Sequence, residues 1–283
     1  MIAKKLSHAI FFVILVLGFI PRSEAAPLKV AVTILPVADM VQQIAGQEIQ
    51  IVTILPPGAN PHTFELTPRL IKELDGSKVI FRIGKNFDDW IARVSENLPG
   101  IQLISLNQGI KSINEDPHYW LSIENAKGMV KQIAQILIAA DPSNQAKYQT
   151  NLIRYLEELD ETDEHIKEEL NSLPQKKIVT FHDGWRYLAR DYGLEIVATV
   201  ESSEGNEPTP QRLAKLYEMI HQHQIRVLFT EPTASRSLTH SIAHDFDLAV
   251  VELDPMGFKA ENKTFINLML HNADEIEEAL ERK

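Results

Sequence analysis

The sequence predicts an α/β protein of two lobes, each with a mostly parallel sheet flanked by helices, joined by one long α-helix. Short apolar runs alternate with helical patterns, and this alternation occurs twice along the 283 residues. Such alternation is typical of parallel strands with helices packed on their faces. Between the two repeats, residues 143–172 contain neither glycine nor proline. We therefore expect an N-terminal lobe over 26–141, a linking helix over 142–173 and a C-terminal lobe over 174–283.

The first half contains four strand candidates, each a short apolar run rich in β-branched residues. They lie at 29–35, 49–55, 78–83 and 101–105. Helical patterns occupy 37–45, 67–75, 88–97 and 122–140. Pro36 suits the first turn of the first helix, where its missing N–H is not needed.

The second half repeats this plan. Its strand candidates are 177–180, 194–200, 226–229 and 248–253. Its helical patterns are 184–192, 209–222, 235–245 and 263–281. Thr209 and Pro210 form a start signal for a helix, because threonine caps the free N–H groups and proline fits the first turn.

The linking segment has the marks of a single amphipathic helix. Pro142 and Pro174 bracket it, and apolar residues recur every three to four positions between Leu152 and Leu170, with one break at Asp163. A helix of this length spans roughly 45 Å. A connection between two lobes explains that length, and a coiled-coil arm is the alternative.

The N-terminus predicts export. Lys4 and Lys5 precede an uncharged apolar run over 9–20, followed by the small-residue pattern Ser23-Glu24-Ala25. This order is typical of a secretory signal peptide over residues 1–25, and the run is too short to span a bilayer comfortably. We expect a periplasmic protein that starts near Ala26 and has no stable membrane insertion after cleavage; an uncleaved anchor is the alternative.

Charge and cysteine content narrow the ligand class. The net charge is −11, and removing residues 1–25 takes away three basic residues and one acidic residue, which makes it −13. Such acidity argues against nucleic acid and suits a cation. The sequence has no cysteine, so we expect a free protein and not a lipoprotein tethered through cysteine. A metal site must then use His, Asp or Glu.

Three of the ten histidines stand out because each lies in a loop that follows a predicted strand. They are His62, His118 and His182, and Asp254 follows the last strand in the same way. Ligands of open parallel sheets bind beyond the carboxyl ends of the strands, so residues from both halves can meet in one cleft. Three imidazoles and a carboxylate form a set that suits Zn²⁺. For each residue alone, a surface histidine or a turn aspartate is the alternative.

The segments around these residues carry a family resemblance. They read GANPHTFELTP, DPHYWL, TFHDGWRYLARDYGL, FTEPTAS and ELDPMG. With them, the chain closely resembles the zinc/manganese-binding solute-binding proteins of ABC transporters, which have two lobes joined by a rigid helix. The resemblance implies metal ligands at His62, His118 and His182. Asp254 matches a position that supplies a carboxylate in many members, and Glu65 and Glu231 resemble alternative acids.

The resemblance also implies the function: a monomeric, non-catalytic receptor that delivers a metal to the membrane permease of an ABC importer. Many zinc-specific members carry a His-rich loop that is missing at 107–115, whereas manganese-type members tend to have Glu where this chain has His182. Imidazole favours Zn²⁺ over Mn²⁺, so we expect zinc, with Mn²⁺ or Fe²⁺ as alternatives.

Two rival functions remain open at this point. A zinc hydrolase needs an open coordination position and a general base, but the sequence contains neither a His-Glu-x-x-His helix motif nor a Gly-x-Ser-x-Gly elbow. A surface adhesin built on the same fold predicts the same metal site with a protein as its partner.

Overall fold

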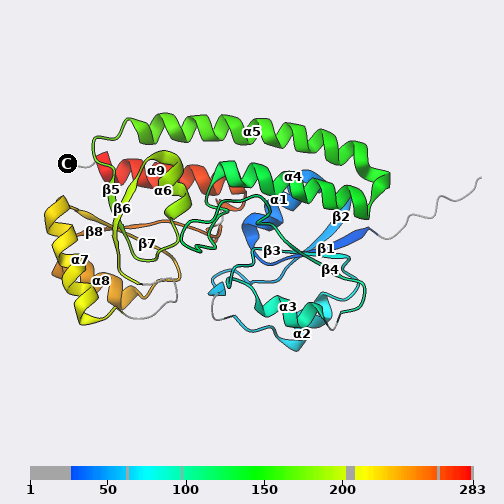
Figure 1. Cartoon of the computed structure of the whole chain (residues 1–283), viewed down its shortest axis with the longest axis horizontal. Helices are drawn as coiled ribbons and strands as arrows, with labels where there is room; N and C mark the ends of the chain where they lie inside the picture. The colour runs from blue at the N-terminus through cyan, green and yellow to red at the C-terminus, as the bar shows by residue number, and fades with distance from the viewer. Residues whose placement is uncertain (1–26, 62–63, 97, 202–207, 260–261, 282–283) are drawn as a thin grey trace, which may run out of the picture.

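A computed structural model describes residues 27–61, 64–96, 98–201, 208–259 and 262–281. Two lobes lie side by side, and the long helix α5 (Gln145–Asn171) runs along one edge of both (Figure 1). The expected signal peptide over 1–25 lies outside the described residues. No helix in the described ranges is long and apolar enough to cross a membrane.

The N-terminal lobe is built on a parallel four-stranded sheet. Its strands are β1 (Leu28–Val32), β2 (Ile49–Thr53), β3 (Val79–Arg82) and β4 (Gln102–Ser105), in the order β2-β1-β3-β4. Helices α1 (Leu35–Ala45) and α4 (Ile123–Ala140) lie between this sheet and α5, whereas α2 (Pro68–Glu73) and α3 (Trp90–Ser95) lie on the far side (Figure 1).

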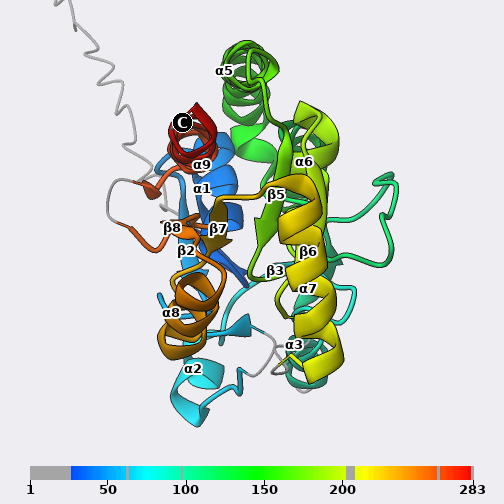
Figure 2. The ribbon, with the colours of Figure 1, turned by 90° about the vertical axis from the view of Figure 1, so that its left-hand side faces the viewer.

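The C-terminal lobe repeats the topology. Strands β5 (Lys177–Thr180), β6 (Glu195–Thr199), β7 (Val227–Thr230) and β8 (Ala249–Glu252) pair in parallel in the order β6-β5-β7-β8. Its helices are α6 (Arg186–Tyr192), α7 (Pro210–His223), α8 (Arg236–Asp245) and α9 (Phe265–Glu281). Figure 2 shows α7 and α8 on opposite sides of the sheet. The predicted fold class is confirmed, and the Thr209 side chain caps α7 by accepting a hydrogen bond from the Arg212 N–H.

Helix α5 packs against both lobes. A short 3-10 turn over Pro142–Asn144 precedes it, and α5 then contacts α1, α4, α6 and α9. Its buried stripe includes Tyr155, Leu159 and Ile166, which is the apolar periodicity seen in the sequence. The coiled-coil alternative is wrong, because the apolar face of α5 is covered by helices of the same chain.

One hydrophobic core runs through both lobes. It joins Val30 and Phe81 of the first sheet, Leu159 of α5, and Phe229 and Leu253 of the second half. Helix α9 belongs to the second half by sequence, yet it packs on α1 and α5. Packed interiors resist continuous deformation, so this shared core limits how far the lobes can separate as rigid bodies.

Candidate metal centre

A small cleft opens between the lobes, at the carboxyl ends of the strands. Its volume is about 70 Å³, which suits an ion with a few waters. Both lobes contribute to its wall. The lining residues are Asn60, Pro61, Phe87, His118 and Trp120 from the first half, and Phe181, His182, Glu201, Glu231, Thr233, Ala234, Pro255, Met256 and Phe258 from the second.

His118 is held in one orientation. It lies in the loop between β4 and α4 and is 4% exposed. Asp116 Oδ1 is 2.7 Å from His118 Nδ1 and also accepts a hydrogen bond from the His118 backbone N–H at 2.9 Å. A carboxylate at Nδ1 makes that nitrogen the donor, so the neutral ring presents the lone pair of Nε2 to the cleft.

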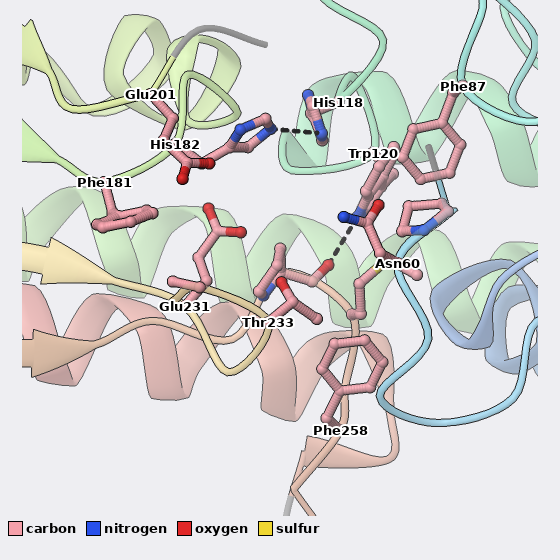
Figure 3. Close-up of a pocket in the computed structure, with 14 residues that line it drawn as sticks. Asn60, Phe87, His118, Trp120, Phe181, His182, Glu201, Glu231, Thr233 and Phe258 are labelled. Carbon is pink, nitrogen blue, oxygen red and sulfur yellow. Dashed lines mark hydrogen bonds between the residues drawn. The ribbon is translucent and has the colours of Figure 1, made fainter. Parts of the chain in front are cut away.

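His182 faces His118 across the cleft. It follows β5 by two residues, and its Nε2 lies 3.3 Å from Nε2 of His118 (Figure 3). Zinc–nitrogen bonds of about 2.0–2.1 Å in tetrahedral geometry separate two ligand nitrogens by about 3.3–3.4 Å. The two imidazoles are therefore placed as two ligands of one ion would be.

Gly184 allows this close approach of the two rings. A Cβ atom at Gly184 would lie 2.9 Å from Cδ2 of His182 and 3.3 Å from Cδ2 of His118. Both distances are shorter than ordinary van der Waals contacts. The glycine therefore leaves the space that the histidine pair occupies.

Two glutamates add negative charge to the cleft. Glu201 follows β6 and Glu231 follows β7, and both carboxylates point toward His182 (Figure 3). Trp185 Nε1 donates a hydrogen bond to Glu231 Oε1 at 2.8 Å. Burial raises the pKa of Glu231 to about 7, against the lowering effects of His118 and of the Trp185 hydrogen bond.

The buried carboxylate of Asp116 also favours a cation. Its Oδ2 atom is buried and has no hydrogen-bond partner among the described residues. A buried carboxylate oxygen without a partner costs free energy unless positive charge lies nearby. A metal ion bound at Nε2 of His118 would place such charge on the imidazole that Asp116 contacts.

Asp254 lies outside the lining of the cleft. Its side chain is fully buried, and both carboxylate oxygens accept hydrogen bonds from its own loop. The donors are the backbone N–H groups of Met256, Gly257, Phe258 and Lys259 and the side-chain amide of Asn262, at 2.8 to 3.2 Å. Asp254 thus shapes the loop whose residues Pro255, Met256 and Phe258 form part of the wall.

His62 lies outside the described residues, and its neighbour Pro61 lines the cleft. Trp90 Nε1 donates a hydrogen bond to the Pro61 carbonyl at 3.1 Å, which fixes the chain next to His62. Glu65 is not among the lining residues. Within the described ranges, no group of three or more His, Cys, Asp or Glu side chains is close enough to hold a metal.

Sequence reasoning missed Glu201, Asp116 and Gly184. Glu201 follows a predicted strand directly, so the rule used for the other strand ends would have found it. Asp116 lies within the DPHYWL segment but was not identified as the partner of His118. No sequence pattern reveals the role of Gly184, because it depends on a contact with His118 of the other lobe.

The chain matches the family described as zinc-uptake complex component A, periplasmic, over residues 30–279. It is 30% identical over 277 residues to the manganese ABC transporter substrate-binding lipoprotein PsaA of Streptococcus anginosus, with 90% of each chain covered. A zinc-bound deletion mutant of ZnuA matches with a TM-score of 0.83 and 28% identity, over 91% of this chain and 100% of that one. The periplasmic zinc-binding protein TroA of Treponema pallidum, at 23% identity, shares the fold with a TM-score of 0.84, over 91% of this chain and 100% of that one.

These matches cover both lobes and the linking helix together. Members of the family are receptors, so the hydrolase alternative is wrong. The chain belongs to the zinc-uptake component A family, the metal-binding substrate-binding proteins of ABC transporters.

Proposed function

We propose that this protein captures Zn²⁺ between its lobes through His62, His118 and His182 and delivers it to the permease of an ABC importer. The observation that supports this most directly is the 3.3 Å separation of the two Nε2 atoms, with the His118 ring oriented by Asp116. An imidazole-rich set favours zinc. The carboxylates in the cleft supply the negative charge that a divalent cation needs.

Metal identity is tested by competition. Manganese is the second candidate, because Glu201 and Glu231 line the cleft and the S. anginosus relative is named for manganese. Zinc-free protein without a His tag is titrated with Zn²⁺, Mn²⁺ and Fe²⁺ at matched free concentrations. We expect one ion per chain and binding in the order zinc above iron above manganese, as the general affinity series predicts. Tighter binding of Mn²⁺ than of Zn²⁺ would overturn the zinc assignment.

For the fourth ligand we propose Glu231. Its carboxylate already lies in the cleft, whereas Asp254 as a ligand would have to give up hydrogen bonds from its own loop. Water is the remaining alternative. The variants Glu231→Gln and Asp254→Asn separate these roles. We expect E231Q to weaken zinc binding at least tenfold, and D254N to lower thermal stability with a smaller effect on affinity.

The raised pKa of Glu231 gives E231Q a second readout. The folded state holds this proton more tightly than the unfolded state, so Glu231 costs stability as pH rises from about 4.5 toward 7. Glutamine has no charge to bury. E231Q should therefore raise the thermal midpoint of the metal-free protein at pH 8 while it weakens zinc binding. A lower midpoint would mean that the ionised carboxylate stabilises the fold.

We further propose that the protein acts outside the cytoplasm as a free monomer. The family description names periplasmic members, and the S. anginosus relative is named a lipoprotein, whereas this chain has no cysteine. Cell fractionation and light scattering on the purified protein test these points. An adhesin role predicts binding to a host or bacterial surface protein that is independent of the permease; zinc uptake that persists after deletion of the gene would favour that role.

A further inference from the structure

The loop that carries His118 contains a tight turn four residues before it. The Asp116 N–H donates a hydrogen bond to the Ile113 carbonyl at 2.8 Å, which closes the turn. Between them, Asn114 and Glu115 have φ values of 47° and 59°. The left-handed region is unfavourable for residues other than glycine, so this turn needs support from its surroundings.

That support comes from the opposite lobe. Tyr187, on α6, is fully buried, and its hydroxyl contacts both ends of the turn. It accepts a hydrogen bond from the Ile113 N–H at 3.3 Å and donates one to the Asp116 carbonyl at 3.2 Å. One hydroxyl of the C-terminal lobe therefore clamps the turn that contains the orienting carboxylate of His118.

The rest of the segment is attached to both lobes. Trp120 Nε1 donates to the Pro255 carbonyl at 2.9 Å, and Ser122 Oγ donates to Asp191 Oδ2 at 2.5 Å; both acceptors belong to the second half. Toward its own lobe, Tyr119 donates its hydroxyl hydrogen to the Ile83 carbonyl at 2.7 Å. Separation of the lobes must therefore break these contacts or displace the His118 segment.

We propose that Tyr187 is a positioning residue for the metal site, acting through Asp116 on His118. The inference rests on the proposed function, since it takes His118 as a ligand. The Tyr187 hydroxyl keeps the His118 imidazole in place only while the two lobes are together. Opening of the cleft by the importer then loosens one ligand and speeds release of the metal.

The test compares Tyr187→Phe with Tyr192→Phe. Tyr192 lies on the same helix, is equally buried, and donates its hydroxyl hydrogen to Asp163 of α5 at 3.1 Å, away from the cleft. Both variants keep the ring and lose the hydroxyl. Each protein is loaded with Zn²⁺ and mixed with excess chelator. We expect Y187F to release zinc roughly tenfold faster than wild type, as the loss of two buried hydrogen bonds implies, and Y192F to stay within twofold.

A spectroscopic readout separates positioning from general destabilisation. Cobalt in the site reports ligand geometry through its visible absorption, which should change in Y187F and not in Y192F. Hydrogen exchange should show lost protection at the Ile113 amide of Y187F, with the amides of α6 unchanged. If Y187F lowers the thermal midpoint more than Y192F does, hydrogen exchange still separates the two explanations. Positioning predicts lost protection at the Ile113 amide with α6 unchanged, whereas general destabilisation predicts lost protection in α6 as well.

The outcomes distinguish this inference from the function beneath it. If wild type binds no zinc, or if His118→Ala binds as wild type does, the proposed function fails. If wild type binds zinc and His118→Ala does not, but Y187F matches Y192F in release rate or keeps Ile113 protected, Tyr187 does not position the ligand.

Discussion

The two lobes share one strand order but present their functional groups differently. In the C-terminal lobe, every strand is followed within two residues by a titratable side chain: His182, Glu201, Glu231 and Asp254. In the N-terminal lobe, the residues that line the cleft lie on long loops. Pro61 is eight residues beyond β2, and His118 is thirteen residues beyond β4.

This difference determines what holds each group. A residue next to a strand end is held in place by the rigid sheet. A residue in the middle of a loop needs its own attachments, because loops lie at the low-stability end of a structure. His118 accordingly has Asp116, Tyr119 and Tyr187 around it, and the chain at Pro61 has Trp90. Removal of these contacts should weaken metal binding by displacing His118 or the chain at Pro61, while the residues at the strand ends of the C-terminal lobe stay in place.

The largest effect should come from pH, because it acts on both lobes together. The proposed ligand set binds metal as neutral imidazoles and an ionised Glu231, whose pKa burial raises to about 7. Affinity should therefore fall as pH drops below 7, and each displaced proton adds about one to the slope of log affinity against pH. Zinc titrations between pH 5 and 8 should show a slope above two at the acidic end. A flat profile between pH 5 and 7 would contradict histidine ligation.

Removal of a ligand is the next largest change. His118→Ala and His182→Ala should each weaken zinc binding by more than about a hundredfold, because each removes one of the three proposed imidazole ligands. His240→Ala, at an exposed position on α8, is the matched control. Titration calorimetry on the three variants is the measurement. Comparable affinity of H182A and H240A would remove His182 from the proposed ligand set.

Asp116→Asn tests the N-terminal lobe without touching a ligand. Partners of metal-bound histidines typically contribute 10–100-fold to affinity, and asparagine accepts from Nδ1 without a full negative charge. We expect roughly a thirtyfold loss of zinc affinity. Asp183→Asn, beside His182, removes a carboxylate that Arg186 contacts at 2.5 Å and serves as the control on the other lobe. An equal loss in both variants would mean that general charge, and not the orientation of His118, is responsible.

Gly184→Ala should separate the two rings. Its Cβ would lie 2.9 Å from His182, so one imidazole has to shift, and we expect about a tenfold loss of affinity. Gly128→Ala is the control, since a Cβ there meets nothing within 4 Å and alanine favours its helix α4. G128A should be neutral or slightly stabilising by thermal denaturation. Wild-type zinc affinity in G184A would show that the two imidazoles can move without weakening the metal site.

The smallest expected effect is that of Trp90→Phe. Phenylalanine keeps an aromatic ring against Phe64, whose centroid lies 5.0 Å away, but loses the hydrogen bond to the Pro61 carbonyl. One lost hydrogen bond predicts a two- to fivefold loss of zinc affinity. Tyr148→Phe, which loses a bond to Asp141 far from the cleft, is the comparison. A larger loss would mean that the chain next to His62 depends on this single attachment.

The sequence by itself determined the elements and their order. Strands and helices follow from local periodicity, and the boundaries of α5 differ from the predicted segment by only a few residues. It also indicated His118 and His182, because both lie in loops after parallel strands, beyond whose carboxyl ends ligands bind, and in segments that carry the family resemblance. These features depend on neighbours along the chain, which a single sequence displays in full.

The tertiary structure decided what each polar group contacts. Asp254 and Glu231 both follow strands, yet the first turns into its own loop and the second faces the cleft. The packing of α9 on α1 and the clamp of Tyr187 on the His118 turn join residues that are far apart in sequence. Such contacts depend on the few ångströms that separate packed elements. No periodicity encodes those distances, because they result from how the whole core packs.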